Sequence, residues 1–153
     1  MKAINFDLKD KEGKTHSLDN TKDYTVLYFY PKDNTPGCTL EAKSFENDLE
    51  RYDRLNSRVI GVSGGDEKSK QKFCEKNNLT LLLLSDTDYK LSTNYGVYGA
   101  KKFMGREYMG ISRTTFILDR NLEIIKKFEN VNPLNHSKEV LEFIEEVKNG
   151  KHK

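Results

Sequence analysis

Residues 24–39 read YTVLYFYPKDNTPGCT, so a run of β-branched and aromatic side chains ends at a proline and leads into a polar loop. A continuous apolar run of this kind indicates a central strand that is buried on both faces. Over residues 39–52, four apolar side chains recur at helical spacing: Ala42, Phe45, Leu49 and Tyr52. This stripe predicts an amphipathic helix. Cys38 therefore lies where a buried strand passes into the first turn of a helix.

The rest of the chain alternates between strand and helix patterns. Residues 4–18 predict a short N-terminal β-hairpin. Beyond residue 52 the expected elements are, in order, a strand at 58–63, a helix at 67–77, a strand at 79–85, a short helix within 86–95, a loop at 96–110, a hairpin of strands 114–118 and 122–128, and a helix at 136–149. This order favours an α/β fold with a central mixed β-sheet flanked by helices on its two faces. A chain of 153 residues can bury one ordinary core, so we expect a single domain over residues 1–153.

The charge balance argues against binding to polyanions. Lys and Arg number 26 against 24 Asp and Glu, the formal net charge is only +2, and the two signs are interspersed. Such a chain offers no basic field for nucleic acid or for anionic lipid. It also contains no apolar stretch near the roughly 18 residues of a membrane span, and no signal-peptide pattern at its start. We therefore expect a cytoplasmic protein.

The potential metal ligands are few and scattered. Cys38 and Cys74 are isolated from each other, and His16, His136 and His152 show no metal-binding spacing. The sequence therefore predicts neither a metal site nor a cofactor.

Cys38 stands in a setting that favours a thiolate over a thiol. The first turn of a helix offers unpaired backbone N–H groups and the positive end of the helix dipole. Thr35, three residues earlier, would cap the helix or bind an incoming oxygen, Pro36 suits the first helical position, and Gly37 permits close approach of the backbone to a ligand. The residues by themselves point to a reactive thiol, the alternative being that Cys38 is a small buried apolar side chain.

Pro31, Thr35 and Cys38 together resemble the active-site signature of the peroxiredoxins. The longer string at residues 29–42, FYPKDNTPGCTLEA, resembles the bacterioferritin comigratory protein or Q-type group of that family. Further segments resemble the family in its usual order: LSD at 84–86, GVYG at 96–99, KFMG at 102–105 and ISRTTF at 111–116. The resemblance implies a thioredoxin-like fold and the reduction of hydroperoxides without metal or flavin.

The resemblance also implies roles for individual residues. Cys38 would be the peroxidatic nucleophile that becomes a sulfenic acid, Thr35 would orient the peroxide, and Pro31 would shield the thiolate. Arg113 would stabilise the thiolate and the charge on the leaving oxygen, and Glu41 would pair with Arg113 and fix its angle. Without the resemblance, Arg113 would be interpreted as a surface ion-pair residue and Glu41 as an ordinary acid in a first helical turn.

The second cysteine departs from the commonest pattern. Many relatives carry a resolving cysteine five positions after the peroxidatic one, where this chain has Lys43. The resemblance then leaves Cys74, 36 residues after Cys38, as the resolving cysteine. The alternative is a core residue beside Phe73. Because the helix at 67–77 has only Phe73 and Cys74 as clear apolar anchors, we expect it to be weakly held.

The implied cycle is that of a thioredoxin-dependent peroxiredoxin. A hydroperoxide oxidises Cys38, Cys74 closes an intramolecular disulfide, and a thioredoxin-like reductant opens it, all in a monomer. One alternative is a one-cysteine peroxiredoxin in which Cys74 is structural. Another is a redox-inactive thioredoxin-like binding module. A disulfide oxidoreductase would require a Cys-x-x-Cys motif, which the sequence lacks.

Overall fold

The computed structural model describes residues 1–150. In chain order its elements are β1 (Leu8–Lys9), β2 (Thr15–His16), β3 (Tyr24–Phe29), α1 (Pro36–Asn47), α2 (Leu49–Arg54), β4 (Ser57–Ser63), α3 (Glu67–Asn77), β5 (Leu82–Ser85), α4 (Lys90–Asn94), β6 (Tyr98–Phe103), β7 (Arg106–Ile111), β8 (Thr114–Leu118), β9 (Ile124–Phe128) and α5 (His136–Lys148). The N-terminal hairpin, the α3 helix and the late hairpin were all expected from the sequence, and their existence is confirmed.

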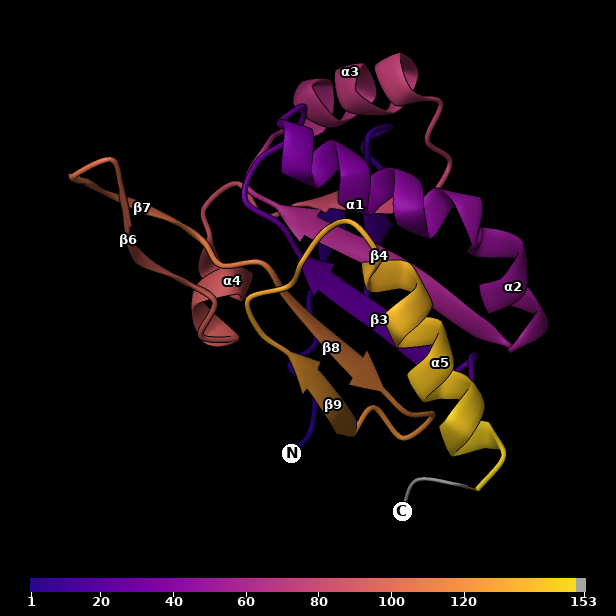
Figure 1. Ribbon diagram of the computed structural model, residues 1–153. Helices are drawn as coiled ribbons and strands as arrows, with labels where there is room; N and C mark the ends of the chain where they lie inside the picture. The colour runs from indigo at the N-terminus through magenta and orange to yellow at the C-terminus, as the bar shows by residue number, and fades with distance from the viewer. Residues whose placement is uncertain (151–153) are drawn as a thin grey trace.

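The main sheet is mixed, as predicted. Its strand order is β2-β1-β5-β4-β3-β8-β9, with β3, β4 and β5 parallel to one another and the remaining pairs antiparallel. The central strand β3 lies between β4 and β8, so Phe29 at its end pairs with Val62 on one side and with Thr114 on the other. This register brings the loop after β3 and the start of β8 to the same end of the sheet (Figure 1).

Helices cover the two faces of the sheet unequally. Figure 1 shows α1 and α5 in front of the sheet, with α3 above them. The core on that side is built from strands and from α1, α2, α3 and α5, and contains Tyr28, Tyr30, Cys38, Phe45, Tyr52, Phe73, Cys74, Ile117, Val140 and Ile144, among others. The core on the opposite side packs α4 and the N-terminal segment against the sheet, and contains Phe6, Leu18, Leu27, Phe29, Ile60, Leu84, Leu91, Tyr95 and Phe116, among others.

The helix expected at 39–52 is two helices. Asp48, between α1 and α2, has φ −107° and ψ 5°, outside the helical range. Its backbone N–H bonds to the Phe45 carbonyl three residues back, which tightens the last turn, and its carboxylate accepts a hydrogen bond from Ser137 at the start of α5. The interruption coincides with a contact to a distant helix, which the apolar periodicity of residues 39–52 does not predict.

The prediction of a loop at 96–110 was wrong. Strands β6 and β7 pair antiparallel with Phe103 opposite Arg106, and this two-stranded sheet extends from the body of the molecule (Figure 1). The turn between them, Met104-Gly105, has φ of 51° and 80°, as a two-residue hairpin turn requires. Methionine is an unusual residue for the left-handed region, so the turn carried no sequence signal.

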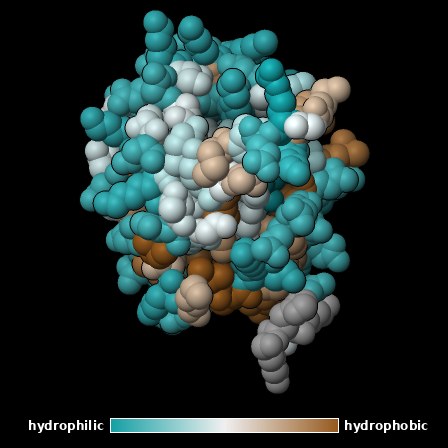
Figure 2. Space-filling model, turned by 90° about the vertical axis from the view of Figure 1, so that its left-hand side faces the viewer, coloured by the Kyte–Doolittle hydropathy of each residue, from teal (hydrophilic) through white to brown (hydrophobic). Residues whose placement is uncertain are grey.

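The hairpin exposes large apolar side chains: Phe103, Met104, Tyr108 and Met109. On the face of the molecule drawn in Figure 2, apolar surface lies in separate patches within a largely hydrophilic surround. Among the described residues, no helix is both long and apolar enough to cross a membrane.

The expectation of a weakly anchored α3 was wrong in one respect. Phe73 and Cys74 are buried as predicted, but Lys70 is buried as completely as Phe73. The sequence pattern treats a lysine as part of a solvated face, whereas here its ammonium lies in the interior beside a carboxylate. Charge pairing therefore adds to the apolar anchoring of this helix.

Candidate active site

Cys38 lies in the first turn of α1, at the carboxyl end of the central strand, as predicted. Pro36 occupies the first turn, and Thr35 precedes it in extended conformation with its carbonyl accepting from the Thr39 N–H at 2.9 Å. The Cys38 thiol is free and its residue is only 1% exposed. Local sequence explains this position, because the proline starts the helix and the preceding buried strand fixes where the helix begins.

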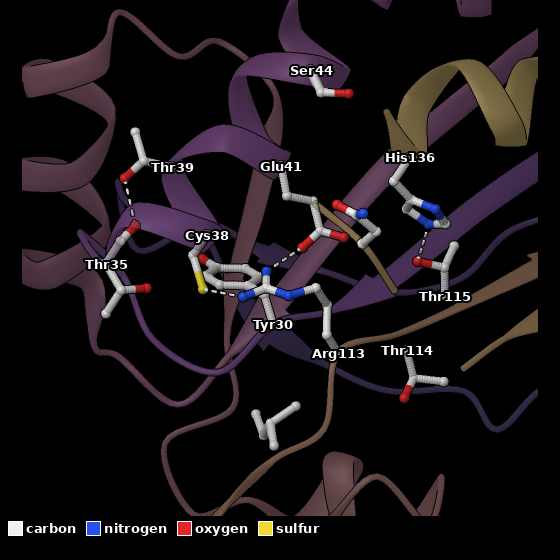
Figure 3. A network of polar contacts seen from close by, with 12 residues as sticks. Tyr30, Thr35, Cys38, Thr39, Glu41, Ser44, Arg113, Thr114, Thr115 and His136 are labelled. Carbon is white, nitrogen blue, oxygen red and sulfur yellow. Dashed lines mark hydrogen bonds and ion pairs between the residues drawn. The ribbon is translucent and has the colours of Figure 1, made fainter. Parts of the chain in front are cut away.

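Thr35 does not cap the helix with its side chain, which contradicts one of the two roles expected for it. Its hydroxyl donates to the Lys32 carbonyl at 2.9 Å, across the turn that leads into α1. The residue is half-buried and lies beside Cys38 at the helix start (Figure 3). Pro31, the residue two after the end of β3, is also half-buried. Both residues therefore lie in the partly exposed segment that leads into the helix of Cys38.

Arg113 reaches the thiol from the start of β8, the strand next to β3 in the sheet. It precedes β8, and its Nη2 donates to the Cys38 sulfur at 3.5 Å while its Nη1 donates to Glu41 Oε1 at 2.8 Å (Figure 3). The Arg113 side chain is 16% exposed and that of Glu41 is fully buried. Arg113 is therefore not a surface ion-pair residue. Its planar guanidinium donates to the Cys38 sulfur through one nitrogen and to the Glu41 carboxylate through the other.

For both Glu41 and Arg113, burial and the neighbouring charges shift the pKa in opposite directions. Burial raises the pKa of Glu41 to about 7, although Arg113 acts to lower it. Burial by itself would lower the pKa of Arg113, but Cys38 and Glu41 outweigh it and the pKa is raised above its ordinary value. Among the described residues Glu41 Oε2 has no hydrogen-bond partner. The guanidinium is thus permanently charged beside a carboxylate that titrates near neutrality.

Gly37 makes room for this arrangement. A Cβ atom at this position would lie 3.0 Å from Arg113 Nη2 and 3.8 Å from the Pro133 side chain. The sequence indicated a close approach at Gly37, and the group that approaches is the guanidinium itself. A glycine one residue before Cys38 therefore lets Arg113 reach the sulfur.

Lys101 is a second cation near the thiol that the sequence did not reveal. It lies on β6, and its Nζ donates to the Ile111 carbonyl at 3.0 Å. Burial and the neighbouring Arg113 lower the pKa of Lys101, while Cys38 opposes them. The side chain is placed there by the β6–β7 hairpin, so no local pattern marked it.

His136 supports the strand that carries the arginine. It is buried at the start of α5, and its Nε2 shares a hydrogen bond with Thr115 Oγ1 at 2.7 Å, two residues after Arg113 (Figure 3). Its Nδ1 lies 3.0 Å from Glu139 Oε1. Burial lowers the pKa of His136, and Glu139 opposes that effect. The sequence drew attention to this histidine only as a possible metal ligand.

Cys74 is a free, buried thiol late in α3. It belongs to the same apolar core as Cys38, and burial raises the pKa of its thiol. Over residues 1–150 the structure shows no cluster of three or more His, Cys, Asp and Glu side chains able to hold a metal ion. His152 lies outside the described residues.

A free thiol at a helix start, held by a guanidinium on a mixed sheet flanked by helices, is the arrangement that the resemblance to thiol peroxidases of thioredoxin-like fold implies. The comparisons agree. The AhpC/TSA family model matches residues 1–127. Peroxiredoxin Bcp of Bacillus subtilis is 42% identical over 148 residues, which cover 96% of this chain and 94% of the relative. Peroxiredoxin Bcp of Escherichia coli K12 is 35% identical over 94% and 93% of the two chains.

Solved structures agree as well. The bacterioferritin comigratory protein of Xanthomonas campestris matches with a TM-score of 0.87 at 30% identity, covering 94% of this chain and 91% of that one. A cysteine-to-serine mutant of PrxQ from Xylella fastidiosa matches with a TM-score of 0.89 at 34% identity, covering 95% and 91%. The chain belongs to the AhpC/TSA family, in its Bcp or PrxQ group of peroxiredoxins. The resemblance noted in the sequence and the thioredoxin-like fold are confirmed.

Proposed function

We propose that Cys38 is the peroxidatic nucleophile of this peroxidase. The single observation that carries the proposal is the contact of Arg113 with the Cys38 sulfur, in a guanidinium already oriented by Glu41. The Cys38 thiolate attacks one oxygen of a hydroperoxide, the O–O bond breaks, and the sulfur becomes a sulfenic acid. The departing oxygen takes a proton and leaves as an alcohol or water. Arg113 stabilises the negative charge on the thiolate and then on that oxygen.

Thr35 and Pro31 act on the substrate side. The Thr35 hydroxyl donates to Lys32, and a hydroxyl that donates one bond still has lone pairs that accept another. We therefore assign Thr35 to receive the O–H of the peroxide and aim its O–O bond at the sulfur. We assign half-buried Pro31 to limit the access of water to the thiolate. Glu41 is a positioning residue, since it contacts Arg113 and not the thiol.

Cys74 is proposed to resolve the sulfenic acid. Its sulfur attacks the Cys38 sulfur, an intramolecular disulfide forms, and the hydroxyl leaves as water. Both thiols are free and buried in one core, within separate helices. The X. campestris peroxiredoxin Q has been solved with serine at each of two cysteines, and those cysteines have the same spacing as Cys38 and Cys74. This spacing supports a shared pair of functional cysteines.

The cycle closes with an external reductant. Membership of the peroxiredoxin family implies a peroxide substrate and a thioredoxin-like reductant in general terms. We propose a thioredoxin-like protein for this chain, acting on a cytoplasmic, monomeric enzyme of one domain. The cytoplasmic assignment rests on chemistry, because a thiol pair that must return to the reduced state suits a reducing compartment.

The Cys74→Ser variant tests the assignment of the two cysteines. We expect it to consume about one peroxide per chain, to fail in turnover with thioredoxin and thioredoxin reductase, and to accumulate sulfinic acid at Cys38 as peroxide rises. The Cys38→Ser variant should consume none. Mass spectrometry of the oxidised natural sequence should show a Cys38–Cys74 bond within one chain.

The same experiment separates the alternatives. Normal turnover of Cys74→Ser would identify a one-cysteine peroxiredoxin in which Cys74 is a core residue. A natural chain that loses no thiol on addition of peroxide would contradict the assignment of Cys38. An intermolecular bridge in the oxidised protein would contradict the monomeric cycle.

A further inference from the structure

The ammonium group of Lys70 is buried in α3 with all three of its hydrogens directed at acceptors. Its Nζ lies 3.0 Å from Asp33 Oδ2, 2.7 Å from Ser63 Oγ and 3.1 Å from the Gly65 carbonyl. The Lys70 side chain is 0% exposed and that of Asp33 is 1% exposed. A buried lysine of this kind is rare unless it is paired, because removing the charge from water is costly.

Asp33 belongs to the loop that leads to Cys38, between β3 and α1. Its Oδ1 accepts the Tyr30 hydroxyl at 2.5 Å, and its Oδ2 accepts Ser69 Oγ at 2.7 Å besides Lys70. The carboxylate thus receives bonds from the end of the central strand on one side and from α3 on the other. One side chain in the peroxidatic loop ties that loop to the helix that carries Cys74.

Gly65 and the ring of Tyr30 enclose the Asp33–Lys70 ion pair. A Cβ atom at Gly65 would lie 2.2 Å from Asp33 Oδ2, so only glycine fits there. The aromatic ring of Tyr30 lies below the ammonium, 5.5 Å from Lys70 Nζ, and also packs against Phe73 at 6.2 Å between ring centroids. The ion pair therefore lies within a packed polar network that closes the junction between the loop and α3.

We propose that the buried pair Asp33–Lys70 is a latch that holds α3 against the peroxidatic loop, and that its release sets the rate at which Cys74 resolves oxidised Cys38. The proposal rests on the resolving role proposed above for Cys74. The step it controls is the attack of the Cys74 sulfur on the Cys38 sulfenic acid, which forms the S–S bond and releases water. Asp33 and Lys70 are positioning residues, since neither needs to touch the peroxide.

The position of Lys70 explains why it would govern this step. It lies four residues before Cys74, one helical turn away, so the two side chains project from the same face of α3. A disulfide requires Cα atoms within roughly 7 Å, so we infer that a backbone segment moves when Cys74 of α3 bonds to Cys38 of α1. Movement of α3 away from the loop at Lys70 must separate its ammonium from the Asp33 carboxylate. Burial makes that separation slow, because a charge left unpaired in the interior is costly.

Two variants test the latch. Lys70→Met removes the ammonium but leaves the Asp33 carboxylate buried and unpaired, which threatens folding. The double variant Asp33→Asn with Lys70→Met removes both charges at nearly constant volume and retains an oxygen for Tyr30. Lys72→Met is the matched control, since it makes the same substitution on the same helix at an exposed position. All are made in the full chain.

Two measurements are made on each protein. Amide hydrogen exchange of residues 67–77 in the reduced protein reports the opening of α3 without reference to any chemistry. A single turnover with one equivalent of peroxide, quenched with a thiol-blocking reagent and a sulfenic-acid trap, gives separate rate constants for oxidation of Cys38 and for disulfide formation.

In the double variant we expect faster exchange over α3 and disulfide formation faster by roughly tenfold, within the range in which contacting pairs couple. The peroxide concentration that over-oxidises Cys38 should rise by a similar factor.

The outcomes are distinguishable. Slower resolution in the double variant overturns the latch. Unchanged exchange over α3, or faster exchange with unchanged resolution, also overturns it. An equal acceleration in Lys72→Met would show that the effect is not specific to the pair and would overturn it too. Absence of a Cys38–Cys74 bond in the natural sequence is detected before any variant is made, and it contradicts the proposed function instead.

Discussion

The Nη2 atom of Arg113 lies 3.5 Å from the sulfur of Cys38, although 75 residues separate them in the sequence. The pairing of strands in the sheet explains why these two side chains are close together. Because β8 pairs antiparallel with β3, Thr114 lies opposite Phe29, and the residue before Thr114 arrives beside the loop that follows β3. The thiol and the guanidinium thus meet at one end of two neighbouring strands, the thiol from α1 after β3 and the guanidinium from the residue before β8.

Arg113→Ala should lower the rate of Cys38 oxidation by peroxide by roughly 100-fold or more, the usual cost of one donor to a developing negative charge. Arg113→Lys should recover only part of that loss, because an ammonium cannot contact both the sulfur and Glu41 as the fork does. Stopped-flow oxidation of the reduced protein measures the rate. Arg120→Ala, an exposed arginine paired with Asp23, is the control and should leave the rate unchanged. A rate retained in Arg113→Ala would refute the role of the guanidinium.

Thr35→Val should lower the rate of oxidation by peroxide by roughly 100-fold, since it removes the hydroxyl proposed to orient the substrate while preserving its shape. Reaction of Cys38 with a small alkylating agent, which needs no such orientation, should change far less. Thr35→Ser should restore most of the rate. Thr39→Val, which removes a hydroxyl that donates to the Thr35 carbonyl, is the matched control. Equal losses with peroxide and with the alkylating agent would indicate that Thr35 acts on the sulfur or on the fold.

Gly37→Ala should lower the rate of oxidation by roughly tenfold. Its new Cβ would lie 3.0 Å from Arg113 Nη2, so the guanidinium must shift by a few tenths of an ångström from the sulfur; misplacement by a full ångström costs about 100-fold. Gly99→Ala, where no atom lies within 4 Å of the new Cβ, is the control in the same assay. A crystal structure of Gly37→Ala with Arg113 in its original place and an unchanged rate would contradict this account.

Glu41→Gln should change how stability depends on pH. Burial raises the pKa of Glu41 from 4.5 to about 7, so the native state retains this proton more strongly than the unfolded chain does. Stability from this group is therefore fully present below pH 4.5 and is lost as pH rises through 7. The difference in unfolding free energy between the variant and the natural sequence should grow in favour of the variant over that window, by on the order of 3 kcal/mol.

Urea unfolding at pH 5 and pH 8, followed by circular dichroism, measures this difference. Glu50→Gln, at an exposed position on α2, should show no such change between the two values of pH. A difference that is the same at both pH values would show that Glu41 is ionised throughout the window.

Much of the local structure followed from the sequence. The strand at 24–30, the helix start at Cys38, the exact span of α3 and the final helix depend on residues within a few positions of one another: apolar periodicity, a proline in the first turn, and the N-cap Asp66, whose side chain accepts from the Ser69 N–H. The boundary at Asp48 and the β6–β7 hairpin were not predicted, because the first coincides with a contact to α5 and the second turns at a left-handed methionine. The residues of the site were named through a family resemblance, and the structure brings Arg113, Glu41 and Cys38 together.

By itself, then, the sequence determined the secondary structure around Cys38 and the kind of chemistry expected there, since short-range sterics and helix-end electrostatics act within one or two turns. Only the tertiary structure decided which distant groups meet. The register of β8 against β3 brings Arg113 to the thiol, and the packing of α5 places His136 on Thr115. The enclosure of Lys70 beside Asp33 was equally invisible in the sequence. A lysine in an alternating charge pattern is expected to be exposed to solvent unless the fold places a carboxylate beside it in the interior. Here that carboxylate is Asp33, which lies 37 residues away in the sequence.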